Sequence, residues 1–165
     1  MIRSVKDDEV AEALDIINEA ARAYNGVIPP DCWHEPYMSR EELLAEIGAG
    51  VKFWSYEEEC RLVGVMGRQE LQEVTLIRHA YVRTGVQRRG IGAALLAQLR
   101  QGVRQPILVG TWAAAWWAIR FYEKHGFKLV TPEEKDRLLS THWSISPRQM
   151  ETSVVLADEK WFGRA

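Results

Sequence analysis

Residues 79–96 read HAYVRTGVQRRGIGAALL and join a strand, a glycine loop and a helix in one continuous stretch. The strand is expected over residues 74–82, which are rich in β-branched and aromatic side chains. Apolar residues recur at helical spacing from Ile91 to Leu99, so a helix is expected to begin near Gly90. The first turn of this helix is therefore built from glycine.

This glycine turn is suited to bind an anion. The first amides of a helix lack intrahelical partners, and Gly90 and Gly92 have no Cβ to keep a phosphate at a distance. Arg88 and Arg89 add positive charge at the rim. Two known phosphate motifs are excluded: Gly92 is followed by alanines instead of a Lys-Ser/Thr pair, and Leu95 replaces the last glycine of G-x-G-x-x-G. An ordinary glycine turn before a surface helix is the alternative.

Two segments resemble the motifs of one protein family. Residues 87–93, QRRGIGA, fit the pattern Q-x-x-G-x-G-A, and residues 118–127, AIRFYEKHGF, fit A-x-x-F-Y-x-x-x-G-F. In this order they resemble motifs A and B of the GNAT superfamily of N-acetyltransferases, of the bacterial single-domain type. The likeness covers residues 62–156.

The resemblance implies a binding site for acetyl-CoA. Its pyrophosphate is expected on the glycine-loop amides, and its pantetheine arm along the backbone near Val82, where residues 74–82 and 106–111 separate. A backbone amide near Val82 is the expected oxyanion donor. The predicted cofactor-binding residues are Tyr81, Val82, Gln87, Arg88, Arg89, Gly90, Ile91, Gly92 and Ala93.

The resemblance also implies a catalytic acid. Tyr122 matches the family's general acid, and its alternative role is core packing beside Phe121. Motif B has Ala115 where many members carry Asn, so one hydrogen bond to the cofactor is expected to be missing.

The general base departs from the family pattern. Leu76 and Arg78 occupy the positions where many members place a Glu or His, and neither can act as a base at neutral pH. A bulge in the strand would turn His79 toward the cleft, and Glu73 is a second candidate, acting through water. A histidine that is simply hydrogen-bonded in place is the alternative for His79.

Two irregular segments are expected to border the acceptor. Residues 27–38 form a loop with three prolines and several bulky side chains, among them His34 and Tyr37. Trp143 lies in a second irregular stretch near the C-terminus. In the family, comparable regions border the acceptor side of the cleft, so His34, Tyr37 and Trp143 are the predicted substrate-binding residues.

The remaining pattern predicts an α+β fold, a GNAT-like mixed and mostly antiparallel sheet with helices on both faces. Ser39 and Glu42 are expected to form a reciprocal capping box. The other expected strands are residues 2–5, 51–56, 62–67, 106–111, 127–130 and 152–156, and the other expected helices are residues 10–24, 40–47, 113–125 and 132–139.

Composition narrows the class of protein. With 165 residues, 47% apolar and 27% charged, the chain fits a single soluble acetyltransferase-like domain over residues 1–165. A net charge of -2 argues against a nucleic-acid partner, and the absence of a long apolar run argues against a membrane. The acidic start argues against a signal peptide and favours a cytoplasmic location. The two cysteines, Cys32 and Cys60, do not suggest a disulfide framework.

These features predict an enzyme that transfers the acetyl group of acetyl-CoA to a primary amine, by direct attack in a ternary complex and without a metal. The amine belongs to a small molecule or to a protein. A different class, a non-catalytic acyl-CoA sensor, would keep the glycine loop and lose the acid and base. The oligomeric state is open, a homodimer included.

Overall fold

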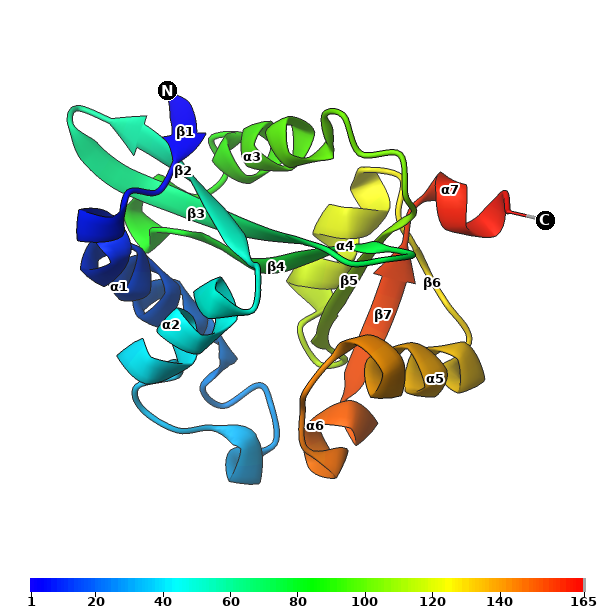
Figure 1. The fold of residues 1–165 in the computed structure, drawn as a ribbon. Helices are drawn as coiled ribbons and strands as arrows, with labels where there is room; N and C mark the ends of the chain where they lie inside the picture. The colour runs from blue at the N-terminus through cyan, green and yellow to red at the C-terminus, as the bar shows by residue number, and fades with distance from the viewer. Residues whose placement is uncertain (165) are drawn as a thin grey trace.

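The computed structural model describes residues 1–164, in which seven strands form one mixed sheet (Figure 1). The strand order is β1-β2-β3-β4-β5-β7-β6, and every neighbouring pair is antiparallel except β4 and β5. The predicted fold class is therefore confirmed. The strands are β1 Ile2–Ser4, β2 Lys52–Glu58, β3 Arg61–Glu70, β4 Thr75–Val82, β5 Ile107–Trp112, β6 Lys128–Leu129 and β7 Ser153–Ala157.

Helices cover both faces of this sheet. They are α1 Val10–Ala21, α2 Arg40–Gly48, α3 Ile91–Arg100, α4 Trp116–Lys124, α5 Pro132–His142, α6 Pro147–Glu151 and α7 Glu159–Phe162. Short 3-10 turns occupy Asp7–Glu9, Arg22–Tyr24, Pro30–Cys32 and Thr84–Val86. Among the helices of residues 1–164, none combines the length and apolar character needed to cross a membrane.

Alternation along the strands divides the core between the two faces. Ile77 of β4 packs with Leu95 of α3 on one face, whereas its neighbour Leu76 packs with Leu139 of α5 on the other. On that second face, α1 and α2 lie beside β2, β3 and β4, while α5 and α6 lie beside β7 (Figure 1). The site described below lies between these two groups of helices.

The parallel strands β4 and β5 pair over a short distance and then separate. Their register joins Thr75 with Ile107, Leu76 with Leu108 and Ile77 with Val109. Beyond these pairs, β5 continues along β7 from Gly110 to Trp112, and β4 continues along β3 to Val82. The sheet therefore opens between the carboxyl ends of two adjacent parallel strands, as predicted, a place where α/β sheets commonly bind ligands.

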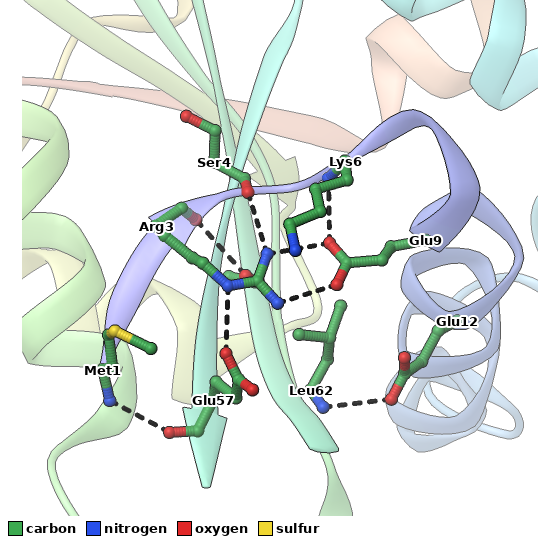
Figure 2. Close-up of polar contacts among 9 residues, drawn as sticks. Met1, Arg3, Ser4, Lys6, Glu9, Glu12, Glu57 and Leu62 are labelled. Atoms are coloured by element: carbon green, nitrogen blue, oxygen red, sulfur yellow. Dashed lines mark hydrogen bonds and ion pairs between the residues drawn. The ribbon is translucent and has the colours of Figure 1, made fainter. Parts of the chain in front are cut away.

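A polar network fixes the N-terminal segment to the β2–β3 hairpin (Figure 2). The guanidinium of Arg3 donates to both carboxylate oxygens of Glu9, at 2.7 and 2.9 Å, and to Glu57 at 2.9 Å. Glu12 of α1 accepts a hydrogen bond from the amide of Leu62 at 3.0 Å. These contacts hold α1 against the sheet, so the loop that follows α1 has a fixed starting point.

Several predicted local features differ in detail. The capping box of α2 is only half formed: the hydroxyl of Ser39 accepts from the Glu42 amide, but the Glu42 carboxylate accepts from that hydroxyl instead of the Ser39 amide. The helix expected from residue 113 begins at Trp116, and the helix expected to end near residue 139 continues to His142. The short helices α6 and α7 were not predicted.

Candidate active site

The loop between β4 and α3 presents free backbone amides to open space. Arg88 and Gly90 adopt left-handed conformations, with φ of 65° and 80°. The first hydrogen bond of α3 runs from the Ala94 amide to the Gly90 carbonyl at 3.0 Å, so the preceding amides are left without helical acceptors. A Cβ placed on Gly90 would meet no atom within 4 Å. The loop therefore has the donors and the room to hold a pyrophosphate.

The side chains around this loop differ in their exposure and contacts. Gln87 donates from Nε2 to the Val82 carbonyl at 3.0 Å and so closes the loop onto β4. Arg89 is exposed and lies 3.3 Å from the Glu58 carboxylate, and Arg88 is also exposed. The side chain of Ile91 is buried in the core, so only its backbone can reach a ligand. A Cβ placed on Gly92 would lie 3.4 Å from the ring of Phe121, so α4 packs closely against this turn.

Val82 turns its backbone toward the gap. The Arg83 amide donates to the Val63 carbonyl at 2.8 Å. In an antiparallel ladder, adjacent residues of a strand point their amides and carbonyls to opposite sides, so Val82, which precedes Arg83, points away from β3. The Val82 amide is thus directed toward the side from which β5 has departed. The Tyr81 hydroxyl lies 3.4 Å from that of Tyr24, and Tyr81 lines a cavity described below, so its contact with the cofactor stays a prediction.

A β-bulge in β4 brings His79 to the same face as Arg78. The register moves from Val65 opposite Tyr81 to Gly67 opposite Arg78, so β4 has one residue more than β3 in this interval. His79 has a φ of 53°, and its ring stacks on Phe53 of β2 with the centroids 6.1 Å apart. The predicted bulge is therefore confirmed, and His79 lines the cavity that opens between β4 and β5.

Glu46 of α2 lies against both of these residues and was not predicted. Its Oε1 accepts from Arg78 Nη2 at 3.0 Å, and its Oε2 is paired with His79 Nε2. Burial opposes ionisation of this carboxyl, but the contact with His79 and the electrostatic influence of His79 and Arg78 lower its pKa below the usual range. Glu46 is therefore an anion that lies between the Arg78 guanidinium and the His79 imidazole. Its position 32 residues before Arg78 leaves no local sequence signal for the contact.

Aromatic side chains form the wall of the cavity. Tyr24 and Tyr37 come from the segment after α1, and Trp112 ends β5, where its Nε1 donates to the Tyr37 hydroxyl at 2.7 Å. The rings of Tyr24 and Tyr37 lie 5.3 Å apart. Burial raises the pKa of Tyr24, Tyr37 and Tyr81, so these hydroxyls stay protonated at neutral pH. These aromatic residues thus present apolar rings and uncharged hydroxyl groups to the cavity.

Of the three predicted substrate-binding residues, Tyr37 and Trp143 line this cavity. Trp143 packs directly against β5, since a Cβ on Gly110 would be 3.2 Å from its ring. His34 is exposed, stacks on the outer side of Tyr37 with centroids 6.2 Å apart, and is not among the lining residues. An ion pair between Asp31 and Arg148, at 2.9 Å, joins the first of the two irregular segments to α6.

Tyr122 approaches the gap from the opposite face. It is 5% exposed and packs on Phe127 and Phe121 of the α3–α4 core. Burial, and to a smaller extent the nearby Tyr24, raise the pKa of Tyr122. Tyr122 is not among the residues that line the cavity. The structure therefore shows its packing role, and its role as the acid stays a prediction.

Glu73 is not among the residues that line the cavity. It is exposed in the turn before β4, near His142, on which its charge acts. The strand from Thr75 to His79, about 13 Å long, lies between it and His79. The role of Glu73 as a base acting through water stays a prediction, and no contact supports it.

No metal site accompanies these groups: in the part of the chain that the structure describes, no cluster of three or more His, Cys, Asp or Glu side chains is placed to hold an ion. Cys32 and Cys60 are both free thiols.

Comparison with known proteins identifies the architecture. A family model described as "Acetyltransferase (GNAT) domain" matches residues 5–142. A structure of PaiA N-acetyltransferase from Thermoplasma acidophilum with coenzyme A is similar, with a TM-score of 0.72, 16% identity, and coverage of 96% of this chain and 97% of that one. The ribosomal-protein-S18-alanine N-acetyltransferase of Escherichia coli is similar with a TM-score of 0.68 and 18% identity. The match covers 96% of this chain and 92% of that one. No curated protein matches the sequence.

A third similar structure is larger. N-acetylglutamate synthase from Neisseria gonorrhoeae, complexed with coenzyme A and N-acetyl-glutamate, gives a TM-score of 0.65 at 17% identity. The match covers 96% of this chain but 34% of that one. At these identities the likeness concerns the fold, and the site residues have to be judged from their own geometry.

Proposed function

Because the chain belongs to the GNAT acetyltransferase family, we propose that it transfers the acetyl group of acetyl-CoA to a primary amine of a small molecule or a protein. One observation carries the proposal: the glycine loop and the aromatic cavity both border the gap between β4 and β5. Acetyl-CoA held by its pyrophosphate at Gly90 can extend along the backbone of Val82. An amine in the cavity then meets the thioester between the two strands.

The reaction is a direct attack with both substrates bound. The neutral amine nitrogen forms a bond to the acetyl carbon, the bond from that carbon to sulfur breaks, and the Val82 amide supports the developing oxyanion. His79 accepts the proton that the amine loses, and Tyr122 gives a proton to the leaving thiolate. The products are an amide and coenzyme A with a free thiol. His79 and Tyr122 return to their starting states by exchange with water.

The fit of acetyl-CoA rests on the loop itself. The open space in front of Gly90 and the free amides before Ala94 suit a diphosphate, and the loop cations Arg88 and Arg89 add attraction. Ala115, which stands where many family members carry Asn, has no polar side chain to offer the cofactor. A cofactor contact at that position is therefore not part of the proposal.

The proposal is tested by measuring thiol release. The protein is incubated with acetyl-CoA and a panel of primary amines that includes alkyl amines, aromatic amines and peptides, and free coenzyme A is detected with a thiol reagent. Release that depends on the amine and yields the acetylated product supports the enzyme. Tight binding of acetyl-CoA without release for any amine would refute it and favour the non-catalytic sensor.

A further inference from the structure

Glu46 is the one carboxylate in contact with the proposed base, within residues 1–164. The side chains of Glu46, Arg78 and His79 are each mostly buried, with 22%, 17% and 15% of their surfaces exposed. They come from two elements, α2 and β4, and they meet because the bulge puts two successive residues of β4 on one face. This contact is not needed for packing alone, since a buried ionic group is seldom more stabilising than an apolar one.

We propose that Glu46 is a positioning residue for His79: it keeps the imidazole proton on Nε2 and leaves Nδ1 free to accept a proton from the acceptor amine. This inference rests on the proposed function, in which His79 is the base. A neutral imidazole carries its proton on one nitrogen, and the partner of that nitrogen decides which. An ionised carboxylate can only accept, so Nε2 must donate to it.

The other groups around His79 do not compete for this role. The guanidinium of Arg78 donates to Glu46 Oε1 and to Gln69 Oε1, and as a cation without a lone pair it cannot accept the imidazole proton. Phe53 covers one face of the ring. The cavity tyrosines, whose hydroxyls are neutral, line the same cavity as His79. His79 Nε2 is buried and its polar contact is the pairing with Glu46 Oε2, whereas Nδ1 makes no hydrogen bond within residues 1–164 and is the nitrogen available to a ligand.

Arg78 gives the inference a sharp test, because it occupies one carboxylate oxygen. In Glu46→Gln the side chain has a single oxygen and an NH₂ group. Arg78 has no lone pair to offer and is always protonated, so it takes that oxygen. The NH₂ group then faces His79 Nε2, which has to accept, and the imidazole proton moves to Nδ1. A substitution that preserves shape is thus expected to invert the tautomer and block the base.

The tautomer is read by nitrogen NMR of the imidazole, at a pH where the ring is neutral, with the signal assigned by its loss in His79→Gln. The wild-type protein is expected to carry the proton on Nε2, and Glu46→Gln on Nδ1. With an amine that turns over, kcat of Glu46→Gln is expected to fall about 10- to 100-fold, with KM for acetyl-CoA nearly unchanged. Glu41→Gln removes the same charge from an exposed site on α2. This control variant is expected to keep the wild-type tautomer of His79 and the wild-type kcat.

Three outcomes would overturn the inference: a wild-type proton on Nδ1, a tautomer that is the same in Glu46→Gln, or an inverted tautomer with full kcat. The first is measured on the wild-type protein and does not depend on whether the variant folds. Failure of the wild-type protein to acetylate any amine would refute the proposed function instead. The nitrogen spectrum would still decide whether Glu46 sets the state of the ring.

Discussion

The glycine loop offers a test in which backbone strain and ligand binding can be separated. Gly90 has a φ of 80°, and Gly102, beyond the other end of α3, has a φ of 74°. A Cβ on either residue would meet no atom within 4 Å. Gly90→Ala and Gly102→Ala therefore carry the same conformational penalty and the same freedom from clashes, but only Gly90 faces the predicted pyrophosphate.

The expected magnitudes follow from this geometry. A left-handed alanine costs about 1–2 kcal/mol, and for a domain of this size each kcal/mol lowers Tm by about 2–4 °C. Both variants are thus expected to lose about 2–8 °C. In Gly90→Ala the methyl group enters the space that phosphate oxygens would occupy. Loss of one hydrogen bond to a charged group, worth about 1.5–3 kcal/mol, would raise the Kd for acetyl-CoA roughly 10- to 150-fold.

Calorimetry of acetyl-CoA binding and thermal unfolding without ligand measure the two effects on the same samples. We expect Gly102→Ala to bind acetyl-CoA like the wild-type protein despite its lower Tm. A folded Gly90→Ala protein with unchanged Kd would refute the assignment of the pyrophosphate to this loop. Equal losses of affinity in both variants would show that strain, and not the lost contact, explains the result.

Three further predictions concern catalysis, the acceptor and acid stability. Tyr122→Phe keeps the ring packing and removes the hydroxyl, so kcat should fall roughly ten- to a thousandfold with acetyl-CoA affinity nearly unchanged. A variant with full kcat, measured where chemistry is rate-limiting, would show that Tyr122 is not the acid. Tyr37→Ala and Trp143→Ala should raise KM for the acceptor more than KM for acetyl-CoA, and equal effects would count against the cavity as its site. Hydrogen bonds from Arg3 lower the pKa of Glu9 from 4.5 to about 2, so its contribution to stability is present above pH 4.5 and is lost as the pH falls toward 2. Urea unfolding should therefore show Glu9→Gln less stable at neutral pH, with the difference from wild type narrowing over that range, and a constant difference would contradict it.

The sequence was most informative where the signal is local. The glycines at 90 and 92 and the apolar spacing after them predict the anion-binding turn and the start of α3, because helix entry depends on neighbouring residues. The same holds for Thr131 and Pro132 at the start of α5. A similar signal, Ser146 followed by Pro147, begins the short helix α6, but no apolar stripe accompanies it and the helix was not predicted.

The site was harder to predict because its contacts are between distant segments. Glu46 belongs to a helix with several glutamates, which resembles a solvated face, and only the packing of α2 on β4 brings it to His79. Conversely, Glu73 is close to His79 in sequence but does not line the cavity with it, because part of the extended strand β4 lies between them. His34 lies one layer outside the cavity for a similar reason: its ring stacks on Tyr37, which takes the inner position.

The short pairing of β4 with β5 also bears on how the protein unfolds. Three residue pairs of parallel ladder connect a four-stranded unit, β1 to β4, with a three-stranded unit, β5 to β7. Parallel pairing is somewhat weaker per residue than antiparallel pairing, and partial opening follows the boundary where the fewest interactions must be broken. The short ladder is thus a narrow backbone connection between two parts of the sheet whose side chains share one core on each face, and a ligand that bridges the gap would strengthen it. Bound acetyl-CoA would then act as a structural part of the sheet as well as a reactant.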